Sequence, residues 1–236
     1  MGPKSLLLAA LVVIMPLSLQ AYFPEDVDRL EKERKCAGCN LAEADLNSWQ
    51  LRGVDLNQAD LDRANLQWVD LKGAQLKGIR AKGTLLRWAN LENADLSGAQ
   101  FAGADLNLLS ASNSIWVGAD LGGSDLSYAE LNNARMDGLI APLTKMLGID
   151  LRGARLKRAN LRNVFLGDAN LIGAHLRGAK LVGASLENTN LTGADLREAD
   201  LTGAKITGAH FDGAQLEGAQ WIDGKVCGLG SVGECK

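Results

Sequence analysis

The chain has 236 residues, 47% of them hydrophobic, and a formal charge of −3, so its length allows one sizeable domain or two small ones. A charge this close to zero excludes the overall basic footprint that nucleic-acid binding requires. Aromatic residues make up only 5%, whereas there are 27 Gly, four Cys and two His, a composition that points to a repeat.

Residues 1–21 have the layout of a secretory signal peptide. Lys4 supplies one positive charge, residues 5–19 are almost wholly apolar, and Ala21 ends the segment. The apolar run of about fifteen residues is shorter than the ~20 that cross a bilayer as a helix, which favours a cleaved signal. Leu19 is large for a position so close to a cleavage site, so an uncleaved membrane anchor is the alternative.

Residues 22–38 are expected to form an N-terminal cap that contains a short helix from Pro24 to Arg34. Pro at the first turn, acidic residues early and basic residues late all favour a helix here. Val27 and Leu30 would then face the domain that follows. The segment contains Cys36 and is followed directly by Cys39, so the two form a CxxC pair.

A large apolar residue recurs every five residues from Leu41 to Trp221. Of these 37 positions, 27 are Leu, seven are Phe, Ile, Met or Trp, and three are Ala. A small apolar residue, usually Ala, precedes each large one by two positions. A period of five matches neither an α-helix nor an ordinary strand. It predicts a coil that turns a corner every five residues and sends one large and one small side chain inward on each side.

Blocks such as Ala44-Asp45-Leu46 and Ala199-Asp200-Leu201 resemble the A(D/N)LXX unit of pentapeptide-repeat proteins, over about residues 39 to 223. The resemblance implies an all-β fold, a right-handed quadrilateral β-helix with four five-residue faces per coil. About nine coils stacked at ~4.8 Å would make a rod ~43 Å long. Gly at the second position after Leu, as at Gly53 and Gly98, suits a tight corner.

Residues 224–236 form a Gly-rich closing segment that contains Cys227 and Cys235. Four cysteines allow three pairings, but the ends of such a rod lie far apart. We therefore expect Cys36 to pair with Cys39 and Cys227 with Cys235, in disulfides that an exported chain favours. For the CxxC pair, thiol-redox exchange is an alternative, although the βαβ setting of thioredoxin-like motifs is missing. Zinc would need two further ligands nearby, and we expect neither a metal nor a cofactor.

Residues twenty apart should stack in one column, and two columns are candidate interaction surfaces. Trp68, Trp88, Leu108 and Tyr128 form an apolar column, which either contacts a partner or covers itself. A basic column contains Lys157, Arg177 and Arg197, with Arg155 beside it. It could dock an acidic partner or an anionic headgroup surface, or it could be solvated charge.

Three segments weaken the repeat, where Ala81, Ala111 and Ala141 replace the large interior residue. We expect residues 139–149 to form a bulged or looped-out excursion, because Pro142 disfavours a central strand. His175 and His210 are expected to be surface residues without a catalytic constellation. The Asp and Asn residues before the large apolar positions are expected to bond local backbone rather than to form a catalytic or calcium site.

These features predict a non-catalytic binding or scaffold protein, not an enzyme, with an unknown protein partner and no small-molecule substrate. The export signal and paired cysteines are similar to those of cyanobacterial pentapeptide proteins of the thylakoid lumen or periplasm. A DNA-mimic topoisomerase-binding protein is an alternative within the family, and a thiol-redox protein is another. Membrane contact is expected only through an uncleaved signal, and the chain is expected to be a monomer or a weak dimer.

Overall fold

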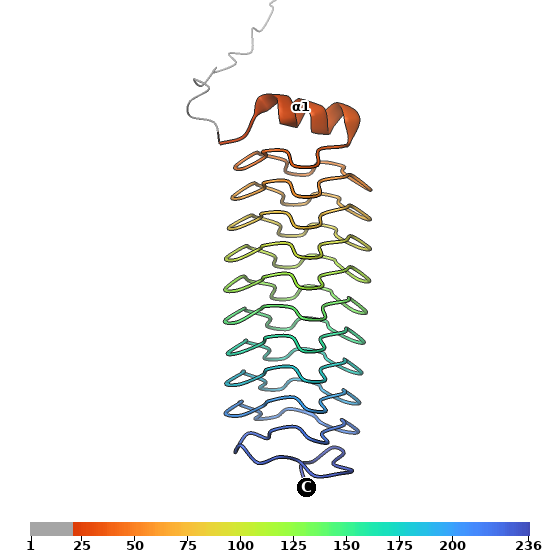
Figure 1. Cartoon of the computed structure of the whole chain (residues 1–236), viewed down its shortest axis with the longest axis vertical. Coiled ribbons are helices and arrows are strands. Elements are labelled where there is room, and N and C mark those ends of the chain that lie inside the picture. The colour runs from red at the N-terminus through yellow and green to blue at the C-terminus, as the bar shows by residue number, and fades with distance from the viewer. Residues whose placement is uncertain (1–20) are drawn as a thin grey trace, which may run out of the picture.

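The computed structural model describes residues 21–236, and the predicted signal peptide therefore lies almost wholly outside the described residues. One helix, α1 (Pro24–Glu33), lies across one end of a stack of coils, and the C-terminus lies at the opposite end (Figure 1). No helix in the described part of the chain is long and apolar enough to span a membrane.

The helix α1 forms where the sequence predicts it. Pro24 occupies its first turn, Glu25 and Asp26 lie in that turn, and Lys32 lies in the last one. These charges oppose the helix dipole at both ends. Leu30 is fully buried and forms part of the same core as the coils, so α1 covers the apolar end of the stack.

The coils repeat every twenty residues. Parallel bridges join each outward residue to the one twenty positions later, from Lys35 with Asp55 to Asp200 with Gln220. Within this ladder the Leu41 N–H donates to the Asp60 carbonyl at 2.7 Å. The chain is therefore a repeat solenoid with five-residue sides. The right-handed winding and the total of about nine coils stay predictions.

Each corner is a four-residue turn with its third residue in the left-handed region. The Ala44 N–H donates to the Leu41 carbonyl at 3.1 Å, and Glu43 between them has φ 62°. This is the hydrogen bond and the positive φ of a type II turn. Gly53 and Gly98 adopt the same conformation, as predicted, at φ 63° and 68°.

Asp and Asn residues before the large apolar positions bond the backbone of these turns. The Asp60 Oδ1 accepts the Asp62 N–H at 3.1 Å, and the Asp95 Oδ1 accepts the Ser97 N–H at the same distance. The prediction that these residues serve local turns is confirmed. Their regular spacing therefore gives no reason to infer a calcium or catalytic surface.

The interior accommodates two of its three small residues, Ala81 and Ala111, beside large aromatic neighbours. Ala111 shares a coil with the buried pair Phe101 and Trp116, whose ring centroids are 5.4 Å apart. Ala81 lies one coil before Phe101 in the same column. Large residues thus fill the space that Ala leaves, and the coil continues without a break.

The expectation of an excursion over residues 139–149 is wrong. The segment keeps the regular pattern, with Ala141 and Met146 buried and Leu143 in the left-handed region at φ 58°. Pro142 occupies the second residue of a turn, where its fixed φ fits. At this position an N–H donates only to side-chain acceptors two residues earlier or one coil earlier, and neither Ile140 nor Gly122 offers one, so proline costs no hydrogen bond.

After residue 221 the parallel ladder ends. Antiparallel bridges join Gln220 to Val226 and Gln215 to Val232, so the closing segment folds back over the last coil. The structure has disulfides between Cys36 and Cys39 and between Cys227 and Cys235. Each disulfide holds one end of the rod.

Candidate interaction surfaces

The predicted apolar column forms one exposed corner of the rod, here called the aromatic corner: Trp68, Trp88, Leu108 and Tyr128. Their exposed fractions are 54%, 38%, 40% and 55%. Trp68 and Trp88 stack with ring centroids 4.3 Å apart, and the Arg87 guanidinium lies 5.1 Å from the Trp88 ring. The column covers itself in part, yet all four side chains keep substantial contact with solvent.

Three further apolar residues extend this surface, and sequence reasoning missed them. Leu85, Leu147 and Phe165 are exposed and occupy the same side of their coils as the aromatic corner. Leu147 and Phe165 line a hollow of about 290 Å³ together with Ser127 and Lys145. Writing the sequence in rows of twenty brings these positions together. Together with the aromatic corner they are here called the apolar strip.

The four residues of the aromatic corner hold an unfavourable backbone conformation. Their φ values are between 58° and 61°, in the left-handed region. Bulky L-residues avoid this region because Cβ approaches the following carbonyl, at a cost of roughly 1–2 kcal/mol each. Gly fills the same turn position at many other corners, including Gly148, which lies directly against the Tyr128 ring.

The predicted basic residues lie along a different corner, and most of them are already paired. Arg155 contacts Asp137 at 3.0 Å, Arg177 contacts Glu198 at 2.5 Å, and Arg197 contacts Asp195 at 2.8 Å. The hydrogen bond from Arg197 holds the pKa of Asp195 below its ordinary value. Much of the basic character read from the sequence is therefore neutralised within the rod.

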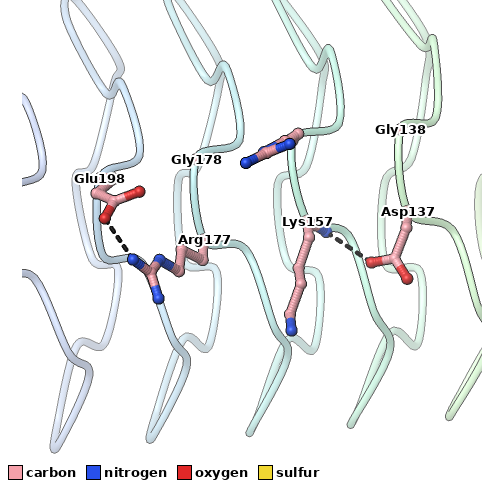
Figure 2. A pocket seen from close by; sticks show the side chains of 7 residues that line it. Asp137, Gly138, Lys157, Arg177, Gly178 and Glu198 are labelled. Carbon is pink, nitrogen blue, oxygen red and sulfur yellow. Dashed lines mark hydrogen bonds and ion pairs between the residues drawn. The ribbon is translucent and has the colours of Figure 1, made fainter.

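Lys157 is the exception in this column, and it borders a hollow of about 650 Å³ (Figure 2). The hollow is lined by Asp137, Gly138, Lys157, Arg158, Arg177, Gly178 and Glu198. Arg158 lies in the basic middle of the sequence but outside the predicted column. Half a coil separates this basic corner from the aromatic corner, so the two surfaces lie at opposite corners of the rod.

The N-terminal cap brings Asp26 close to both sulfur atoms of the CxxC pair. These three residues are the one group in residues 21–236 whose ligand atoms lie close enough for a metal. With both sulfurs in a disulfide, the group offers no thiolate, and Asp26 instead accepts the Asn40 N–H at 2.8 Å and pairs with Arg29. Its local role is to fix α1 on the first coil. His175 and His210 are exposed, as predicted.

Comparison with known proteins identifies the class. The pentapeptide repeat family matches in eight copies, over residues 39–78, 70–107, 110–138, 149–188 and 184–220. The chain therefore belongs to the pentapeptide repeat family, as the A(D/N)LXX blocks predicted. No curated protein sequence matches the chain significantly.

Solved structures of the family resemble the chain. HetL from the cyanobacterium Nostoc sp. strain PCC 7120, a protein involved in heterocyst differentiation regulation, is 30% identical with a TM-score of 0.51, covering 88% of this chain and all of HetL. A protein from the Arabidopsis thaliana thylakoid lumen is 26% identical with a TM-score of 0.42, covering 48% and 83%. The fluoroquinolone resistance protein QnrB1 is 19% identical with a TM-score of 0.39, covering 76% and 89%.

Proposed function

We propose that the chain is a non-catalytic binding or scaffold protein and that its contact surface is the apolar strip. The observation that carries this proposal is the row of exposed apolar side chains running from Trp68 to Phe165 along one side of the rod. Large exposed apolar patches mark contact sites in soluble proteins. The partner is a protein with an apolar surface.

The backbone of the aromatic corner supports this role. Trp68, Trp88, Leu108 and Tyr128 occupy left-handed turn positions that Gly fills at lower cost. Strained residues persist where the surrounding structure holds them. The rigid coils beneath supply that support, so a contact made by these side chains would meet a preformed surface.

We also propose that the protein works outside the cytoplasm, in the thylakoid lumen or the periplasm. The charged and then apolar run of residues 1–21 and the two short-range disulfides support this assignment. The proposed organisation is a signal over 1–21, a cap over 22–38, repeats over 39–223 and a closing segment over 224–236. N-terminal sequencing of the mature protein tests the cleavage.

A matched pair of variants tests the contact surface. Leu108→Gly removes one side chain of the aromatic corner, and Leu143→Gly removes an exposed Leu from the same turn position, with the same φ of 58°, at another corner. The mature protein is used to capture partners from the native host, and each captured protein is purified for direct binding measurement. We expect Leu108→Gly to weaken binding and Leu143→Gly to leave it unchanged.

A stronger variant, Trp68→Gly with Trp88→Gly and Tyr128→Gly, should abolish the interaction. Gly is chosen because it suits the left-handed backbone at these positions, so the coils remain folded. A partner that binds wild type, Leu108→Gly and the triple variant equally would contradict the proposal. The CxxC pair provides the control for thiol exchange, since Cys36→Ser with Cys39→Ser should leave capture unchanged.

A further inference from the structure

The hollow at the basic corner contains more cationic than anionic groups. Lys157, Arg158 and Arg177 line it, against Asp137 and Glu198. Both carboxylates are occupied: Asp137 accepts from Arg155 at 3.0 Å and from the Lys157 N–H at 3.2 Å, while Glu198 pairs with Arg177. Within residues 21–236 neither the Lys157 ammonium nor the Arg158 guanidinium forms an ion pair. In the described chain these two cations therefore face the space without an ion-pair partner.

A backbone donor lies beside these cations. At this turn position the N–H usually donates to an acid or amide two residues earlier and in some coils to one a coil earlier, as when Asp62 accepts the Lys82 N–H at 2.9 Å. The residue one coil before Arg177 is Lys157, whose side chain cannot accept a hydrogen bond. In the described chain the Arg177 N–H has no hydrogen-bond partner. Open N–H groups recur elsewhere on the rod, but this one opens beside Lys157 and Arg158.

Glycine corners leave room for a ligand. Gly138 and Gly178 occupy the left-handed turn position on either side of Arg158, at φ 69° each. A Cβ at Gly138 would meet nothing within 4 Å, and at Gly178 it would meet only the Arg158 Cγ, at 3.5 Å. The Arg158 stem thus lies over Gly178, beside the Arg177 backbone. Figure 2 shows Lys157 and Arg177 on adjacent coils, with Glu198 holding Arg177 at the far rim.

We propose that this hollow binds a phosphate group. One phosphate oxygen would accept the Arg177 N–H, as the Asp137 carboxylate accepts the Lys157 N–H one coil earlier. The remaining oxygens would accept from the Lys157 ammonium and the Arg158 guanidinium. Phosphate suits the hollow better than a carboxylate because it carries more charge and offers three acceptor oxygens to three separate donors. The site lies half a coil from the apolar strip, so the two proposals stand or fall separately.

The test follows the Arg177 backbone amide by NMR while inorganic phosphate is added at constant ionic strength. We expect a saturable shift of this amide in the mature wild-type protein. Lys157→Gln combined with Arg158→Gln removes two charge-assisted hydrogen bonds and should weaken the binding at least about tenfold, the loss expected from even one of them. Lys82→Gln is the matched control, because Lys82 is exposed, occupies the same turn position and precedes a glycine at a different corner.

Two further titrations test which class of anion binds and whether the phosphate belongs to a lipid or to a soluble molecule. Chloride or acetate producing the same saturable shift would overturn the phosphate assignment, as would an unchanged affinity in the double variant. Vesicles containing phosphatidylglycerol identify a lipid headgroup as the source if they bind wild type and Lys82→Gln but not the double variant. Binding of inorganic phosphate without vesicle binding identifies a soluble phosphate instead.

Discussion

At the scale of single residues, the corner positions combine a strained backbone conformation with a side chain that does not pack in the interior. Leu108 and Leu143 share one left-handed conformation, and both are exposed. Neither side chain is needed to fill the interior, which the Leu and Ala columns already occupy. The interior therefore loses little when such a side chain is removed, whereas a contact made by it is lost completely.

We predict that Leu108→Gly and Leu143→Gly both stabilise the protein. Each change relieves the left-handed strain of ~1–2 kcal/mol and adds a Gly entropy cost of ~0.5–1 kcal/mol, so a gain of up to about 1.5 kcal/mol in the free energy of unfolding remains. Urea unfolding followed by circular dichroism measures it. A lower midpoint for both variants would show that the corners are not strained.

Adding side-chain volume to the interior should destabilise the protein, in contrast to the corner substitutions. Ala111 is fully buried beside Phe101 and Trp116, and the Trp116 indole N–H donates to the Ser114 hydroxyl at 2.6 Å. Ala111→Leu should destabilise the protein by about 1–3 kcal/mol, because the rings cannot move without breaking this packing. Leu131→Met, one coil later in the same column, is the control and should cost under ~1.5 kcal/mol. Equal unfolding midpoints for the two variants would contradict the volume exchange.

At the scale of elements, α1 and the closing segment protect the two ends of the ladder. Leu30 lies at the centre of the N-terminal contact and is fully buried. Leu30→Ala should cost about 2–5 kcal/mol of local stability by leaving a cavity under α1. Because coils contact only their neighbours, we expect faster amide hydrogen exchange in the first coil and unchanged exchange in the coils around Leu131. Uniformly faster exchange would mean that the rod unfolds as one unit.

The elements were predictable to the extent that they follow the five-residue period. Leu and Ala at fixed spacing specify the sides and the interior, and the Pro24 helix follows from its terminal charges. Pro142 could not be interpreted correctly, because a rule for strands was applied to a residue that lies in a turn. The pairing of Arg155 with Asp137 and of Arg177 with Glu198 depends on side-chain rotamers across adjacent coils, which a period in the sequence does not fix.

At the scale of the whole molecule, the turn carboxylates link stability to pH. Hydrogen bonds from Arg152 and Arg197 hold the pKa values of Asp150 and Asp195 below the ordinary value. A lowered pKa in the folded state means stabilisation that is complete above the unfolded pKa of ~4 and is lost as the pH falls through the folded value. Lowering the pH should therefore destabilise the turns at many corners of the rod together.

We predict that Asp150→Asn combined with Asp195→Asn lowers the thermal midpoint at pH 7 and loses its effect at low pH. The Asn side chain still bonds the turn backbone, so the difference reports the charge on each carboxylate. Thermal unfolding is measured from pH 7 down to below the folded pKa values, where wild type and variant should converge. A difference that is independent of pH would assign the effect to packing.

The twenty-residue coil has a further consequence for insertions and deletions. Removing five residues leaves every interior Leu in register with its neighbours, so the core survives, but all later coils rotate by a quarter turn. A five-residue deletion between Trp88 and Leu108 would send Leu108 and Tyr128 to a different corner and divide the apolar strip. Removing twenty residues shortens the rod and keeps every surface aligned. The core therefore tolerates length changes in multiples of five residues, whereas the surface columns stay aligned only when the change is a multiple of twenty.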